Sequence, residues 1–140
     1  MKKFSFSLQK VLQLRKFREE ECRIALGQAI GILNRIENEI KENAVRHYHA
    51  ASQRFEDPVN MTAWDNYIIR LGQEAEKLAE QAAQAELVVE EKRALYLEAS
   101  MELKAIEKLK EKREKEYRKE MFNLEMAETD DLTAARRVQY

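Results

Sequence analysis

The fold of this chain is decided by residues 64–106, WDNYIIRLGQEAEKLAEQAAQAELVVEEKRALYLEASMELKAI. Apolar side chains recur there at alternating steps of three and four residues. The positions are Trp64, Ile68, Leu71, Ala75, Leu78, Ala82, Ala85, Val89, Lys92, Tyr96, Ala99, Leu103 and Ile106. Only Lys92 is not apolar. A seam that repeats every ~3.5 residues over about six heptads indicates a long helix that supercoils around a partner helix.

The partner helix lies earlier in the same chain. Its seam consists of Cys22, Leu26, Ala29, Leu33, Ile36 and Ile40, preceded by a denser apolar patch at Leu8, Val11, Leu12 and Leu14. Between the two seams stands the single proline, Pro58, which ends a helix because it lacks an N–H group and restricts the residue before it. Thr62, with Asp65 three residues later, reads as the N-cap of the second helix.

These features predict an all-α fold, a long antiparallel two-helix coiled-coil hairpin that forms one unit over residues 1–140. We expect helix one at about 5–55, a loop at 56–61, helix two at 62–127 and a tail at 128–140. With the turn centred near residue 59, Leu33 faces Ala85 and Ile36 faces Ala82, so that large side chains meet small ones.

Composition agrees with this fold and excludes several others. Of the 140 residues, 78 are Ala, Glu, Lys, Leu or Arg, a composition typical of coiled coils. No apolar run approaches the ~20 residues that span a bilayer. Cys22 is the only cysteine, so no internal disulfide forms, and we expect a cytoplasmic protein.

Motifs for catalysis, cofactors and metals are missing. The sequence has no Gly-rich phosphate loop, and a two-helix coiled coil offers no enclosed pocket for a nucleophile and a base. His47 and His49 are two residues apart and point to different faces of a helix, which is poor geometry for sharing a metal. We therefore expect no catalytic, cofactor-binding or metal-binding residue, and no enzyme.

Charge is uneven along the chain. Residues 1–18 carry six basic side chains and no acidic one, and residues 107–120 carry seven basic and five acidic side chains. An antiparallel hairpin brings these stretches together into a basic end. Such an end is either a solvated surface or a site for an acidic protein partner; nucleic acid is the weaker alternative, because no aromatic stacking platform accompanies the charges.

Several stretches resemble the flagellar export protein FliJ family. They are Phe4-x-Phe6-x-Leu8-Gln9-x-Val11-Leu12-x-Leu14-Arg15, Trp64-x-Asn66-Tyr67, residues 106–113 (IEKLKEKR), and Glu125 with Asp131-Leu132 and Ala134-Ala135-Arg136. They occur in the family's order and span nearly the whole chain. The resemblance implies a coiled coil similar to the central stalk of rotary ATPases, located in the cytoplasm at the export apparatus of the inner membrane.

The resemblance also implies partners. The open end of the hairpin would insert into the hexameric ring of the export ATPase FliI and promote its assembly. Another surface would bind the export gate protein FlhA, and export chaperones would bind as well. Neither nucleic acid nor membrane insertion is implied.

Carried over by matching position, the ATPase-ring contacts would be Leu8, Gln9, Leu12, Arg15, Lys110, Arg113 and Tyr117. The export-gate contacts would be Trp64, Tyr67, Ile68 and Leu71. Arg70 departs from the family, which tends to place an aromatic or large apolar residue there. Leu8, Leu12, Trp64, Ile68 and Leu71 have a second interpretation, as side chains packed inside the hairpin.

Other functions fit the same pattern. A prefoldin-like chaperone would grip clients through exposed apolar ends such as Phe4, Phe6 and Phe55. A nucleic-acid-binding coiled-coil arm would use the basic end. A related stalk from a virulence-type secretion system is separated poorly from a flagellar one by sequence.

Overall fold

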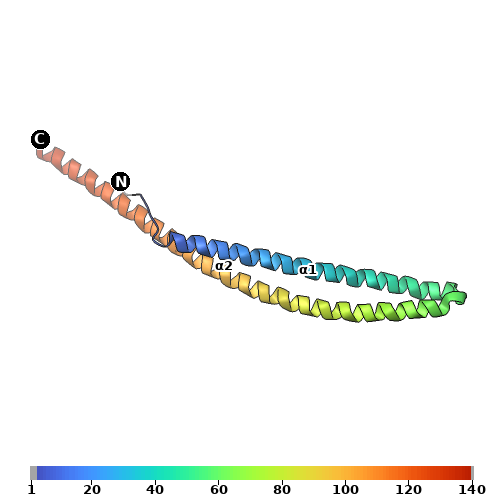
Figure 1. Ribbon diagram of the computed structural model, residues 1–140. Helices are drawn as coiled ribbons and strands as arrows, with labels where there is room; N and C mark the ends of the chain where they lie inside the picture. Colours follow the sequence, from blue (N-terminus) through green and yellow to red (C-terminus); the bar gives the residue numbers. More distant parts are fainter. Residues whose placement is uncertain (1–2, 140) are drawn as a thin grey trace. The chain divides into compact units, whose positions relative to one another are not determined.

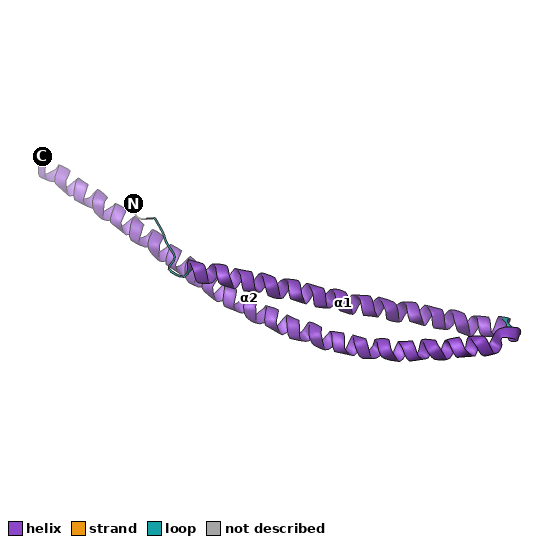
Figure 2. Cartoon of the chain, viewed as in Figure 1, coloured by secondary structure: helices purple, strands orange, loops and turns teal. Residues whose placement is uncertain are grey.

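The computed structural model describes residues 3–139, and its secondary structure is almost entirely helical (Figure 2). Helix α1 spans Gln9–Glu56, a short 3-10 helix η1 spans Pro58–Asn60, and α2 spans Met61–Gln139. No strand occurs within residues 3–139. The predicted all-α helical hairpin is confirmed.

The described chain packs as two compact units. The turn unit comprises Glu20–Leu97, in which α1 and α2 run antiparallel and are joined at η1 (Figure 1). The terminal unit comprises Met1–Glu19 with Glu98–Tyr140, as far as these are described. The expectation of one undivided unit over residues 1–140 stays a prediction.

The predicted seams are the faces that the helices bury. All thirteen seam positions between Trp64 and Ile106 are buried or half-buried, as are the six between Cys22 and Ile40. The fully buried core contains mostly small side chains, with Leu12 and Leu71 as its large members. Small side chains allow the two helix backbones to approach closely.

The turn forms where Pro58 stops α1. The Asp57 N–H donates to the Gln53 carbonyl at 3.0 Å, which closes the last turn of α1, and Pro58 then opens η1. Met61 already has helical dihedrals, so the predicted N-cap at Thr62 is wrong. The Asp65 carboxylate accepts a hydrogen bond from Arg54 Nε at 2.5 Å across the turn, and it is therefore not part of a capping box.

Both ends of the helical region differ from the expected bounds. Helix α1 begins at Gln9 rather than near residue 5, because Phe4 packs against α2 instead, its ring centroid 5.5 Å from that of Tyr117. Helix α2 continues to Gln139 rather than ending near residue 127. No Gly or Pro interrupts it after Gly72, and the hydroxyls of Thr129 and Thr133 donate to carbonyls four residues earlier.

Pairing across the turn unit lies within about one helical turn of the predicted register. A turn centred near residue 59 places Arg54 opposite Trp64 and Asn43 opposite Ala75. The structure pairs Arg54 with Asp65, and Asn43 with the carbonyl of Leu71.

Candidate protein-interaction surfaces

The residues predicted to contact an ATPase ring belong to the terminal unit, and most of them pack within it. Leu12 is 2% exposed. Leu8, Gln9, Arg15, Lys110 and Tyr117 are half-buried, and Arg113 alone is exposed. Of the two interpretations given for Leu12, this burial supports packing inside the hairpin, because α1 turns the side chain toward α2.

Two of these residues take part in contacts between the helices. Arg15 Nη1 lies 2.5 Å from Glu102 Oε2, with each side chain about one-third exposed. Tyr117 lies against Phe4, and an open groove of about 620 Å³ runs beside them, lined also by Phe6, Arg113 and Met121. Phe4 and Phe6 are half-buried and are not the free apolar ends that a chaperone would use.

A different apolar pair is exposed on the terminal unit. Leu14 is 64% and Phe17 is 60% exposed, three residues apart on α1, with exposed Lys10 and Arg18 beside them. We call these four residues the basic face of α1. Sequence reasoning grouped Leu14 with the apolar patch before the seam and did not single out Phe17. The signal was nevertheless present, because Leu8, Leu12 and Arg15 continue the seam spacing toward Cys22, whereas Leu14 and Phe17 do not.

The residues predicted to contact the export gate lie beside the turn. Leu71 is 2% exposed, so its alternative interpretation as hairpin core is the better one. Trp64, Tyr67 and Ile68 are half-buried. The Trp64 ring lies edge-on to those of His49 and Tyr67, with centroids 6.3 and 6.2 Å away.

Arg70 lies against one member of this aromatic group, Tyr67. Its guanidinium carbon lies 5.7 Å from the Tyr67 ring centroid, a cation–π distance. An open groove of about 520 Å³ is lined by the same side chains together with Asp57 and Asn60. The departure from the family at Arg70 therefore places a cation where the resemblance implies an apolar contact.

Asp57 is held at the rim of that groove by hydrogen bonds. The Asn60 amide donates to its carboxylate at 3.0 Å, and this bond is the main cause that lowers the pKa of Asp57 below its ordinary value of 3.8. Desolvation opposes the lowering, and hydrogen bonds from the Trp64 side chain and the Asn60 backbone add to it. The turn thus carries a fixed negative charge beside Trp64.

Sequence reasoning also missed a buried amide in the turn unit. Asn43 is 4% exposed, and its Nδ2 donates to the Leu71 carbonyl at 3.1 Å. Asn43 follows Ile40 by three residues, so the seam spacing already indicated a polar residue at a core position. A single polar residue in a coiled-coil seam favours one register over others.

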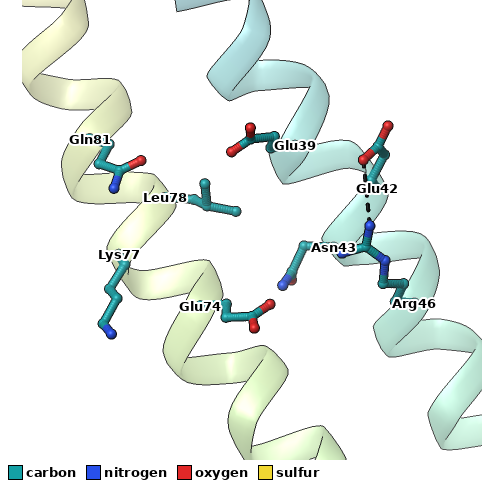
Figure 3. A pocket seen from close by; sticks show the side chains of 8 residues that line it. All are labelled: Glu39, Glu42, Asn43, Arg46, Glu74, Lys77, Leu78 and Gln81. Atoms are coloured by element: carbon teal, nitrogen blue, oxygen red, sulfur yellow. Dashed lines mark ion pairs between the residues drawn. The ribbon is translucent and has the colours of Figure 1, made fainter.

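Beside Asn43 the helices leave an open, polar groove of about 400 Å³ (Figure 3). Glu39 and Glu74 reach into the space between the helices, and Glu42 pairs with Arg46 at 3.6 Å along α1 (Figure 3). Within residues 3–139 no three His, Cys, Asp or Glu side chains are grouped so that they could hold a metal ion. His47 and His49, the only histidines, are both exposed.

The turn also exposes apolar side chains. Phe55 is 79% and Val59 is 91% exposed, and the Arg54 guanidinium lies 5.9 Å from the Phe55 ring centroid.

Among the helices of residues 3–139, none is both long enough and apolar enough to cross a membrane.

Comparison with known proteins gives a family match over nearly the whole chain. The family model described as "Flagellar FliJ protein" matches residues 4–139. No curated protein and no solved structure matches the chain significantly.

Proposed function

Because this chain belongs to the flagellar FliJ family, its role lies in flagellar protein export, and we propose that it acts there as the non-catalytic coiled-coil stalk of the export ATPase. The observation that carries the proposal is the basic face of α1. Leu14 and Phe17 offer apolar area to a partner, and Lys10 and Arg18 offer charges that complement acidic side chains. Ring-type ATPases have a central pore in which such a face meets several subunits at once.

The proposed mechanism is a shift in assembly. A coiled coil that contacts several subunits binds the assembled ring better than it binds free subunits, and it therefore stabilises the ring by mass action. Hydrolysis rises because ring assembly completes the catalytic sites, and no residue of this chain contacts ATP. Leu8, Gln9, Arg15, Lys110, Arg113 and Tyr117 remain proposed ring contacts, whereas Leu12 supports the helix from inside.

The test is ATP hydrolysis by the FliI of the same organism, titrated with this protein, with light scattering to follow ring formation. We expect saturable stimulation that accompanies hexamer formation. Leu14→Ala with Phe17→Ala should abolish stimulation and leave circular dichroism unchanged. Ile24→Ala with Ile32→Ala is the matched control, because both side chains are exposed on α1 in the turn unit. Full stimulation by the Leu14/Phe17 variant would refute the proposed contact.

The turn unit supplies the proposed link to the export gate. We place the FlhA contact on Trp64 and Tyr67, because they form an accessible aromatic group beside an open groove. Ile68 adds apolar area at its edge, and Leu71 supports it from the core. Export chaperones are proposed partners as well, and the working location is the cytoplasmic side of the inner-membrane export apparatus.

Binding to the cytoplasmic domain of FlhA tests this link. Tyr67→Ala should weaken binding, and Tyr48→Ala, on a tyrosine that is 77% exposed on α1, should not. Arg70→Phe supplies the residue type that the resemblance implies and should strengthen binding. Equal effects of the two tyrosine substitutions would place the gate contact elsewhere.

One observation favours a second function, that of a chaperone. Phe55 and Val59 are the exposed apolar side chains that a prefoldin-like holdase would need at its turn. A holdase should suppress the thermal aggregation of citrate synthase, and Phe55→Ser with Val59→Ser should remove that effect. Suppression without any stimulation of FliI would favour the chaperone over the stalk.

A further inference from the structure

Helix α2 carries a second, mostly apolar row in the turn unit, away from the seam that contacts α1. It recurs at steps of three and four residues and therefore lies on one face of the helix. The positions are Ile69, Gly72, Glu76, Ala79, Ala83, Leu87, Glu90, Ala94 and Leu97, and all nine are exposed. We call this set the outer face of α2.

Its large side chains are well exposed. Ile69 is 58%, Leu87 is 68% and Leu97 is 54% exposed, whereas the neighbouring seam residues Leu71 and Val89 are buried. Single exposed apolar residues are ordinary on protein surfaces, but a row with helical period is what a second helix packs against. Gly72, Ala79, Ala83 and Ala94 stand between the large side chains, so a partner backbone has room to approach at these small positions.

In the same segment, acidic and basic side chains lie mostly on different sides of α2. Four glutamates lie on or beside the outer face: Glu76, Glu80, Glu86 and Glu90. At ~100° per residue, Arg70, Lys77 and Lys92 fall on the other side of the helix, and Arg93 lies at the edge of the outer face. Within the described residues, none of the four glutamates takes part in an ion pair, so their charges are available to a partner.

We propose that the outer face of α2 docks an amphipathic α-helix of another protein, one whose apolar row is flanked by Lys and Arg. Charge complementarity decides this choice of occupant. A second copy that used the same face would bring glutamates against glutamates, which is unfavourable. This surface is separate from the basic face of α1 and from the aromatic group at Trp64, and it does not depend on either proposed function.

Binding of designed helical peptides to the full chain tests the proposal. The probe is a peptide of about four heptads with Leu and Ala at a and d and Lys or Arg at e and g. Two comparison peptides carry Glu at e and g, or scramble the basic sequence so that no apolar row remains. We expect the basic amphipathic peptide to bind in isothermal titration calorimetry, more weakly as salt rises, and the other two peptides not to bind.

Paired variants locate the contact on α2. Leu87→Ala with Leu97→Ala should weaken binding about tenfold or more, since the buried apolar area is lost. Val88→Ala with Leu95→Ala is the matched control, because these side chains are 43% and 41% exposed but lie on the other side of α2. Benzoylphenylalanine at Ala83 should crosslink to the peptide, and the same group at Val88 should not.

Several outcomes would overturn the proposal. The first is an equal loss of affinity for the basic peptide in the two double variants. The second is binding of the scrambled or acidic peptide as tight as that of the basic peptide, and the third is no binding of the basic peptide to the parent chain. Sedimentation velocity would assign the face to self-association instead if the parent chain were a dimer and the variant with Leu87→Ala and Leu97→Ala a monomer. Circular dichroism of each variant should match that of the parent chain, because all four substituted side chains lie outside the core.

Discussion

Leu12 and Leu14 are two residues apart on α1, and truncating each to alanine separates packing from partner contact. Leu12 is 2% exposed and Leu14 is 64% exposed. Leu→Ala at a buried site costs ~2–5 kcal/mol, and the lower end applies here because a two-helix core can collapse around the gap. We therefore expect Leu12→Ala to lower the free energy of unfolding by about 2 kcal/mol.

Leu14→Ala should change stability by less than ~0.5 kcal/mol, because most of that side chain is already in water. Both substitutions replace the same residue type in the same helix, so helix propensity cancels in the comparison. Urea unfolding followed by circular dichroism at 222 nm measures the difference. With a urea m-value of ~2 kcal/mol/M, the Leu12 variant should unfold at about 1 M less urea.

In the ATPase assay the larger effect should come from the other variant, Leu14→Ala. Leu14→Ala should reduce the stimulation of FliI at every protein concentration. Leu12→Ala should retain stimulation at temperatures where the chain is still folded. Equal stability loss at both positions would show that Leu14 is packed, and it would remove the basis for placing the ring contact on the basic face of α1.

Three further predictions concern the turn unit. Asp57→Asn should remove a stabilising charge, so that the parent chain is more stable than the variant above pH ~3.8 and loses this advantage as the pH falls through the lowered pKa of Asp57. Thermal unfolding from pH ~2.5 to 7 measures this, and a difference in thermal midpoint that stays the same at every pH would contradict it. Gly27→Ala and Gly31→Ala should each stabilise the chain by about 1 kcal/mol, since an added Cβ meets no atom within 4 Å, and lower thermal midpoints would refute this reasoning. Asn43→Leu should raise the free energy of unfolding by about 1 kcal/mol, because the gain from apolar burial outweighs the loss of one hydrogen bond. A lower free energy of unfolding in urea would show that the Asn43 amide contributes more to stability than its hydrogen bond to the Leu71 carbonyl.

The hairpin could be predicted from the sequence because both of its determinants are local. The apolar spacing defines which side of each helix is buried, and Pro58 defines where the chain turns. The N-cap at Thr62 could not be judged in this way. Its candidate partner, Asp65, bonds to Arg54 across the turn, and that contact depends on how the helices pair.

The candidate sites were harder to predict, because exposure is a property of the folded pair of helices. Leu12 and Leu14 look alike in the sequence, and only their relation to the seam separates a buried side chain from an exposed one. Arg15 and Glu102 are 87 positions apart in the sequence. Their pairing could be predicted only if the register of the two helices were already known. The departure at Arg70 was visible in the sequence, but its contact with Tyr67 was not.

Residues that serve both the hairpin core and a partner need a particular kind of experiment. Trp64 and Ile68 lie on the seam, and Trp64 also lines the open groove beside the turn, so truncating either one changes packing together with any gate contact. Loss of FlhA binding in such variants would not distinguish the two causes. Tyr67 is off the seam, and its ring lies edge-on to Trp64 and within cation–π distance of Arg70. A loss of binding in Tyr67→Ala without a change in the urea midpoint would therefore be the cleanest support for a gate contact at the turn.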